Sequence, residues 1–216
     1  MSEGWTGQET KLLPYGTEGA MPGYVIGIGG GSAAGKSAIA EELQRRLAPL
    51  TVQVINQDRY FRQGDDLPTH SAPSGRIWRD HNHPDSFDFA RLRDDVRRAR
   101  EDEAGVLVVE GILVLHDAEL RGLMDLKLFV EADADERIVR RIRRNVGWGY
   151  DLDGVCDFYL DSVRYRHREF CEPTRAHADL VIPGGAHEAE ERERLLEEVC
   201  DRVTAAIGRG QTERVP

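Results

Sequence analysis

Short apolar runs alternate with longer amphipathic segments along most of the chain. Three of these runs are Tyr24–Ile28, Val52–Ile55 and Val106–Val109, and each is typical of a buried strand. Leu126–Val130 and Asp179–Ile182 follow the same pattern. Because segments of helical period lie between the runs, the pattern predicts right-handed crossovers. We therefore expect an α/β fold with one parallel five-stranded sheet and helices on both of its faces.

The segments between the strands place apolar residues at helical spacing, as Ile39, Leu43 and Leu47 do in the first of them. One intervening stretch, Gln63–Asp85, is instead rich in Pro, Ser, Gly and His, and a loop of that length is expected to be functional or disordered. The predicted helices are Ser37–Leu47, Phe87–Arg100, Asp133–Arg144, Leu152–Phe170 and Glu188–Ile207.

Composition narrows the class of protein. With 216 residues and 40% hydrophobic content, the chain fits one ordinary domain, which we place at residues 23–216 after a flexible tail at residues 1–22. The net charge of −10 argues against general nucleic-acid binding. No apolar run approaches the roughly 20 residues that span a bilayer, so we expect no membrane association. Three widely spaced cysteines favour a reducing, cytoplasmic setting.

A glycine-rich sequence joins the first strand to the first helix and matches the pattern G-x-x-x-x-G-K-[ST]. Its glycines let successive backbone N–H groups point inward at phosphate oxygens, and the helix adds its positive end. In such a loop Lys36 reaches the β- and γ-phosphates, and the Ser37 hydroxyl holds Mg²⁺. The motif therefore predicts that Mg·ATP binds to Gly30, Gly31, Ser32, Ala33, Ala34, Gly35, Lys36 and Ser37.

Two acidic residues follow predicted strands and should face the same crevice as this loop, because ligands bind beyond the carboxyl ends of parallel strands. Glu110 ends the strand Val106–Val109 and is expected near the metal, together with Ser37. Asp58 follows the strand Val52–Ile55 and is placed to accept the proton of an acceptor hydroxyl.

Basic residues gather in the predicted helix after the fourth strand. Arginine suits the charge on a transferring phosphoryl group, because its planar fork binds phosphate oxygens in a bidentate manner. Some of the cluster should face the phosphates as a lid and the rest should face solvent. The cluster consists of Arg137, Arg140, Arg141, Arg143 and Arg144.

A phosphate-binding loop alone does not define the chemistry, since switches, motors and kinases share it. A GTPase switch normally carries an N-K-x-D sequence, whereas the nearest match here is Asn56-Gln57-Asp58, which lacks the lysine. A nucleotide-binding regulatory protein without kinase activity is a further alternative. Asp58 and Glu110 favour a kinase that acts on a small hydroxyl-bearing molecule.

The chain also resembles the uridine kinase family, which neighbours nicotinamide riboside kinase and phosphoribulokinase. The resemblance runs from about Tyr24 to Gly185. It implies a P-loop NTPase fold with a helical lid at about residues 137–151, ATP and Mg²⁺ as cofactors, and a nucleoside-like acceptor. A homo-oligomer is a further expectation. Six stretches carry it in the family's order and spacing: GGGSAAGKS, INQDRYF, HPDSFD, VVEGILVL, LFVEADADERIVRRIRR and EFCEPTRAHADLVIPGG.

The resemblance assigns roles to individual positions. Asp58 matches the family's catalytic base, which takes the proton of the nucleoside 5′-hydroxyl, and Arg141 and Arg144 match lid arginines that contact phosphates. Lys36 joins them as a catalytic residue. Asn82 stands where the family usually has an aspartate that binds the ribose hydroxyls. The residues expected to bind the acceptor are Asp58, Tyr60, Phe61, Asn82, His83 and Arg141.

The chain departs from the family pattern on the acceptor side. Uridine kinases carry a pyrimidine-reading hairpin before the strand that leads to Glu110, but here Arg100 is followed almost directly by Val106. The lid usually continues with Arg-Gly-Arg, whereas this chain has Trp148 and Tyr150, whose rings could stack on a base. Gly184 replaces a basic residue. Nicotinamide riboside, a sugar phosphate or a specialised nucleoside therefore remain alternative acceptors.

Overall fold

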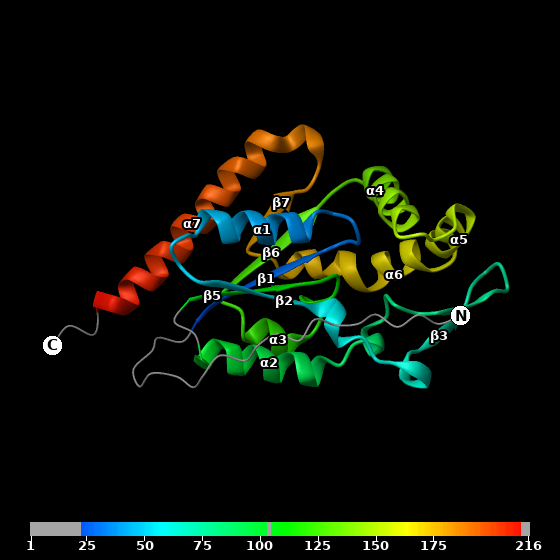
Figure 1. Cartoon of the computed structure of the whole chain (residues 1–216), viewed down its shortest axis with the longest axis horizontal. Helices are drawn as coiled ribbons and strands as arrows, with labels where there is room; N and C mark the ends of the chain where they lie inside the picture. Colours follow the sequence, from blue (N-terminus) through cyan, green and yellow to red (C-terminus); the bar gives the residue numbers. More distant parts are fainter. Residues whose placement is uncertain (1–22, 103–104, 213–216) are drawn as a thin grey trace.

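The computed structural model describes residues 23–102 and 105–212, so the predicted tail at residues 1–22 lies outside the described part. Its main sheet has five parallel strands in the order β2-β5-β1-β6-β7. Figure 1 shows α1 and α7 on one side of this sheet and α2 and α3 on the other. The predicted α/β architecture is confirmed.

The elements begin and end close to the predicted positions. The main strands are β1 (Tyr24–Gly30), β2 (Val52–Asn56), β5 (Val106–Glu110), β6 (Leu126–Glu131) and β7 (Leu180–Pro183). The helices are α1 (Lys36–Arg46), α2 (Phe89–Asp102), α3 (Ala118–Gly122), α4 (Ala134–Gly147), α5 (Leu152–Phe158), α6 (Arg164–Arg166) and α7 (Ala189–Thr212).

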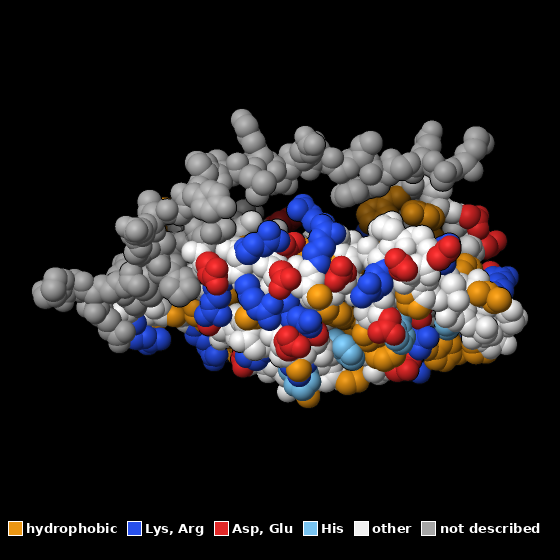
Figure 2. Space-filling view, turned by 90° about the horizontal axis from the view of Figure 1, so that it is seen from below, with side chains coloured by type: hydrophobic (Ala, Val, Ile, Leu, Met, Phe, Trp, Pro, Cys, Tyr) orange, Lys and Arg blue, Asp and Glu red, His pale blue; other side chains and the backbone are white. Residues whose placement is uncertain are grey.

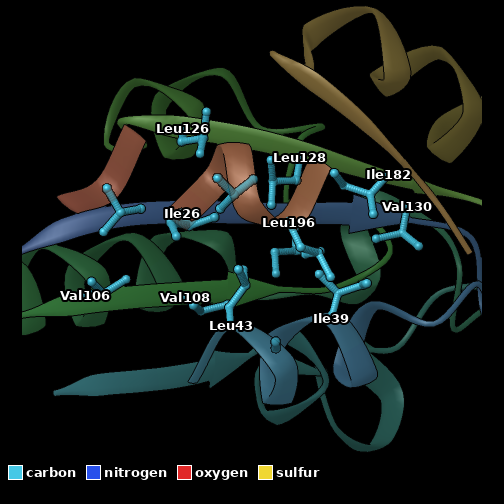
Figure 3. Close-up of a cluster of buried hydrophobic side chains, with 14 of the residues drawn as sticks. Ile26, Ile39, Leu43, Val106, Val108, Leu126, Leu128, Val130, Ile182 and Leu196 are labelled. Atoms are coloured by element: carbon cyan, nitrogen blue, oxygen red, sulfur yellow. The ribbon is translucent and has the colours of Figure 1, made fainter. Parts of the chain in front are cut away.

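The core has two layers because successive side chains of a strand point to opposite faces of the sheet. Ile26 and Ile28 of β1 pack with α1 and α7, whereas Val25 packs with α2 and α3. The strand β5 divides in the same way, with Val106 and Val108 on the α1 side and its alternate residues on the other. Figure 3 shows part of the first layer, where side chains of β1, β5, β6 and β7 meet those of α1 and α7.

The helix predicted at Leu152–Phe170 is present, but it is not a regular α-helix. After α5 the chain makes a π-helical turn at Tyr159–Val163, continues as α6, and makes a second π-helical turn at His167–Cys171. Such wide turns occur often at functional sites.

The predicted loop Gln63–Asp85 contains an antiparallel hairpin, formed by β3 (Thr69–Ser71) and β4 (Ile77–Arg79). Each strand is only three residues long, which is too short for a periodic pattern to predict it. In Figure 1 the hairpin lies at the same end of the molecule as α4 and α5.

The segment that carries this hairpin begins and ends at the same place, where Phe61 and Phe87 lie side by side. Phe61 and Phe87 form an isolated antiparallel bridge, and their rings stack with centroids 4.4 Å apart. The N–H of Arg62 donates to the carbonyl of Ser86 at 2.8 Å, and the N–H of Asp88 donates to that of Tyr60 at 2.8 Å. We call this closure the Phe61–Phe87 bridge.

The basic run Arg91–Arg100 of α2 is paired with acidic neighbours. Arg93 bonds to Asp117 at 2.8 Å, and Arg100 bonds to Asp125 at 2.9 Å. Figure 2 shows the face that carries α2, where positive and negative side chains alternate. The basic run is thus a solvated helix face on which opposite charges pair. Among the described residues, no helix combines the length and the apolar character needed to cross a bilayer.

Candidate active site

A cavity of about 790 Å³ lies beyond the carboxyl ends of β1, β2 and β5. Its wall combines the glycine-rich loop, the ends of these strands, the hairpin β3–β4, and the segment from α4 to α5. The register explains why separate stretches of sequence meet here. Asn56 pairs with Glu110 across β2 and β5, and Ile28, just before the glycine-rich loop, pairs with Glu110 across β1 and β5.

The glycine-rich loop has the backbone geometry of a phosphate cradle. Gly30 has φ 141°, and a Cβ at this position would lie 2.4 Å from the carbonyl oxygen of Val130, so only glycine fits. Gly35 has φ 109° and directly precedes α1, whose first N–H groups therefore face the cradle. The structure thus folds residues 30–37 as the sequence predicts.

Lys36 is buried, and its Nζ donates to the carbonyl oxygen of Gly31 at 3.0 Å. Burial lowers the pKa of Lys36 from its ordinary value, and the carboxylate of Glu110 is the largest opposing influence. A buried cation beside a cradle of N–H groups suits the negative charge of a polyphosphate.

Glu110 lies at the centre of a small polar network. Its Oε1 accepts from the Ser37 hydroxyl at 2.9 Å and from Asn56 Nδ2 at 2.6 Å, and the side chain is 4% exposed. The described residues contain no group of three His, Cys, Asp or Glu side chains placed to hold a metal. Mg²⁺ commonly binds through one or two carboxylates plus substrate phosphates and water, so this donor set fits that ion.

Asp58 lies in the short 3-10 turn Gln57–Tyr60 that follows β2. Its N–H donates to Asn56 Oδ1 at 2.7 Å, and Asp58 lines the cavity as an exposed residue. The buried Gln57 next to it accepts from the N–H of Leu113 at 2.9 Å. These two bonds tie the turn to its own strand and to the segment after β5, which fixes where Asp58 lies.

Two arginines of α4 reach the glycine-rich loop. Arg141 donates to the Ser32 hydroxyl at 2.8 Å, and Arg144 donates to the same oxygen at 3.3 Å. Burial, with the nearby charge of Arg144, lowers the pKa of Arg141 to about 10. Its Nε is buried and has no hydrogen-bond partner within the described ranges. The residue as a whole lines the cavity, beside the Ser32 hydroxyl.

The other arginines of the cluster make no hydrogen bond to Ser32, and they bear out the expected solvent-facing part of the cluster only in part. Arg137 is buried and lies beside Gly31, so it does not face solvent. Arg140 donates to the carbonyl of Gly184 at 2.9 Å, and Arg137 donates to that of Ala132 at 3.0 Å. Arg143 is exposed.

The predicted acceptor residues divide into two groups. Phe61, Asn82 and Arg141 line the cavity together with Asp58. Tyr60 does not, because its hydroxyl turns toward α2 and donates to Asp95 Oδ2 at 2.8 Å, and burial raises its pKa.

His83 also lies outside the cavity wall. Its ring packs edge-on against Phe170 at 4.8 Å, and its Nδ1 accepts from the N–H of Asp85 at 3.1 Å. The shared sequence His83-Pro84-Asp85 thus forms a turn beside the cavity in this structure.

Sequence reasoning missed part of the wall. Trp78 and Arg79 of β4, His81 after it, and Phe158 of α5 line the cavity, together with the lid aromatics Trp148 and Tyr150. No periodic pattern marks Trp78, which is an isolated aromatic residue in the sequence. Its place is fixed by a hydrogen bond to Asp161, 83 residues later, and by packing on Phe158.

Comparison with known proteins places these features in a family. The model of the phosphoribulokinase/uridine kinase family matches residues 85–190. A uridine kinase of Clostridium botulinum is 34% identical over 187 residues, covering 76% of this chain and 89% of the relative. A uridine kinase of Halobacterium salinarum is 34% identical over 211 residues, covering 87% of this chain and 91% of the relative.

Solved structures support the fold. A candidate fructose transport system kinase from Silicibacter sp. TM1040 superposes with a TM-score of 0.58 at 19% identity, covering 77% of this chain and 93% of that one. At this level of identity the likeness concerns the fold alone.

Proposed function

Because the chain belongs to the phosphoribulokinase/uridine kinase family, we propose that it transfers the γ-phosphate of Mg·ATP to the 5′-hydroxyl of a nucleoside-like acceptor. Family membership makes it a phosphotransferase with a hydroxyl acceptor. The observation that supports the finer proposal is that one cavity wall contains the ammonium of Lys36, the carboxylate of Asp58 and the amide of Asn82.

On the donor side, the glycine-rich loop would bind the phosphates of ATP. The N–H groups of residues 31–37 and the Lys36 ammonium would bind the phosphate oxygens, and Ser37 with Glu110 would hold Mg²⁺. When bound, ATP supplies the phosphoryl group that is transferred, and Mg²⁺ neutralises part of the charge on the phosphates. Arg141 and Arg144 would exchange the Ser32 hydroxyl for phosphate oxygens.

On the acceptor side, Asp58 would accept the proton of the attacking hydroxyl. A general base must lie within hydrogen-bond reach of that proton, and Asp58 lines the same cavity as Lys36. Asn82 would donate to and accept from the ribose hydroxyls, since an amide can do both. Its backbone is fixed by a 3.0 Å hydrogen bond to the buried Asp80.

The test is a panel of acceptors incubated with Mg·ATP and read by mass spectrometry of the phosphorylated product. The panel contains pyrimidine and purine nucleosides, nicotinamide riboside and sugar phosphates. We expect phosphorylation of at least one riboside and of no sugar phosphate. Competition of ATP by GTP in the same assay separates this function from a GTPase switch.

Asp58→Asn tests the base. It should lower kcat about 10²- to 10⁴-fold while leaving ATP binding unchanged, because the amide keeps the shape but accepts no proton. Asp66→Asn, on the exposed turn at Gly64–Asp66, is the matched control and should keep wild-type turnover. Normal turnover by Asp58→Asn would refute the assigned base, and a panel without any phosphorylated product would refute the function.

A further inference from the structure

The hairpin β3–β4 is fastened to the π-helical turn that follows α5. Asp161 in that turn is the hub of the contact, because its Oδ2 accepts from Trp78 Nε1 at 3.0 Å and from the Ser74 hydroxyl at 2.6 Å. His70 Nε2 donates to the carbonyl oxygen of the same residue at 3.1 Å. Both hairpin strands and the turn between them are therefore bound to a single residue of the helical segment.

These contacts fix the Trp78 ring in the cavity wall. Its indole N–H is satisfied by Asp161, and its ring packs on Phe158 with centroids 5.2 Å apart at an interplanar angle of 55°. Trp78, Phe158 and Phe61 all line the cavity. An aromatic surface held in one orientation is suited to stacking on a planar ring.

The neighbouring chemistry indicates which part of an acceptor meets this surface. Asp58 and Asn82 lie in the same wall and are assigned above to the reacting hydroxyl and the ribose. A ring attached to that ribose would lie within the same cavity, whose wall on the hairpin side is the aromatic pair Trp78 and Phe158.

We propose that Trp78 is the specificity-determining residue for the acceptor, which it binds by stacking on a planar heteroaromatic ring, and that Asp161 is its positioning residue. This inference rests on the proposed function and deepens it by naming the residue that meets the base of the riboside and the residue that holds it in place. Because every base has a π-face, stacking selects a ring without reading its edge. Purine and pyrimidine ribosides should therefore both bind.

The test measures riboside binding by calorimetry with a non-hydrolysable ATP analogue and Mg²⁺ present, so that no turnover is needed. The probes are uridine and inosine. Trp78→Ala should weaken both by a similar factor, about 10-fold or more. Trp78→Phe should recover most of the affinity, because it restores a ring.

Ile77→Ala is the matched control, since Ile77 precedes Trp78 on the same strand, is 73% exposed and lies outside the cavity wall. It should bind both ribosides as the wild type does, and all three variants should bind the ATP analogue unchanged. Equal riboside affinity of Trp78→Ala and wild type overturns the proposal. So does a loss confined to one base, or an equal loss of the ATP analogue.

The role of Asp161 is tested by a double-mutant cycle. Asp161→Ala should weaken riboside binding in the wild-type background, and this loss should largely disappear in a Trp78→Phe background, because phenylalanine has no N–H to orient. An undiminished loss in that background would show that Asp161 acts on the hairpin as a whole and not on the ring.

The outcomes separate this inference from the function on which it rests. If Trp78→Ala weakens riboside binding but no riboside is phosphorylated, ring binding stands and phosphoryl transfer to ribosides fails. If ribosides are phosphorylated and Trp78→Ala leaves their KM unchanged, phosphoryl transfer to ribosides stands and the role of Trp78 fails.

Discussion

The two halves of the cavity are built in different ways. The donor half consists of eight consecutive residues, Gly30 to Ser37, and of Asn56 and Glu110 at the ends of adjacent strands. The acceptor half joins a hairpin to a helical segment through hydrogen bonds between residues 83 to 91 positions apart in the sequence. Backbone geometry shapes the first half, whereas docking of side chains shapes the second.

Because of this difference, substitutions in the two halves should differ in the size of their effects. In the donor half a larger side chain collides with the backbone of the sheet, as the close approach of Gly30 to Val130 shows. A substitution in the acceptor half meets partly exposed side chains, because Trp148 is 67% and Tyr150 is 62% exposed. We therefore expect the largest effects on the donor side and graded effects on the acceptor side.

The first prediction concerns Lys36. Lys36→Met should lower kcat/KM about 10³-fold, because it removes a buried, preorganised cation from the phosphates. Lys127→Met is the control, since Lys127 pairs with Asp179 at 3.0 Å and lies outside the cavity wall. Steady-state kinetics with both substrates varied measure the effect. A kcat/KM of the variant within about 10-fold of the wild-type value would show that backbone N–H groups alone stabilise the phosphates.

The second prediction concerns the metal side. Glu110→Gln should lower kcat about 10²-fold at low Mg²⁺ and recover partly at high Mg²⁺, because a neutral amide binds a hard cation more weakly. A titration of activity against Mg²⁺ measures it. Glu131→Gln, at the end of β6 two strands away and paired with Arg175, should leave the titration unchanged. The same Mg²⁺ dependence in Glu110→Gln as in wild type would contradict the assignment.

The third prediction concerns pH and the support beneath the donor half. His167 lies against the loop at Gly31, and burial lowers its pKa to about 4. The folded protein keeps this ring neutral, while the unfolded chain takes up a proton near the ordinary pKa of about 6.5. Its contribution to stability is therefore fully present above pH 6.5 and is lost as the pH falls toward 4.

The loss should be on the order of 2 kcal/mol, allowing for partial exposure. His167→Phe removes the titrating group, so its free energy of unfolding should fall less steeply than that of wild type between pH 6.5 and 4. Urea unfolding at a series of pH values measures both slopes. Parallel slopes would show that the acid sensitivity of the donor half arises from other groups.

The fourth and smallest effect is expected at the hairpin. Arg76 pairs with Asp157, but both side chains are more than 40% exposed, and an exposed ion pair contributes little. Arg76→Ala should raise the acceptor KM by only about 2-fold and leave the ATP KM unchanged. A rise comparable with that of Trp78→Ala would mean that this pair, and not Asp161, docks the hairpin.

The sequence predicted the donor half almost completely, for a physical reason. Each feature there is local: a strand, a glycine-rich turn and a helix follow one another, and Glu110 and Asp58 follow strand ends. Strand alternation also predicted both layers of the core. Family resemblance then supplied roles for Asp58 and Arg141, whose positions in one cavity agree with those roles.

The acceptor half escaped prediction because it depends on contacts between distant segments. The strands β3 and β4 have three residues each and no apolar face, so no period marks them. Tyr60 and Phe61 are adjacent, yet the 3-10 turn sends the first toward Asp95 and leaves the second in the cavity. Sequence spacing cannot distinguish two neighbours whose backbone rotates between them.

The Phe61–Phe87 bridge has a consequence for how acceptor preference changes over evolution or in the laboratory. Since both ends of the intervening segment meet at one point, we expect that its interior can be exchanged while the turn Gln57–Tyr60 before it and α2 after it keep their places. The entropy of closing a loop grows only slowly with its length, so longer and shorter replacements are both tolerated. A library randomised between these two phenylalanines would sample new acceptors while inheriting an intact phosphate donor site.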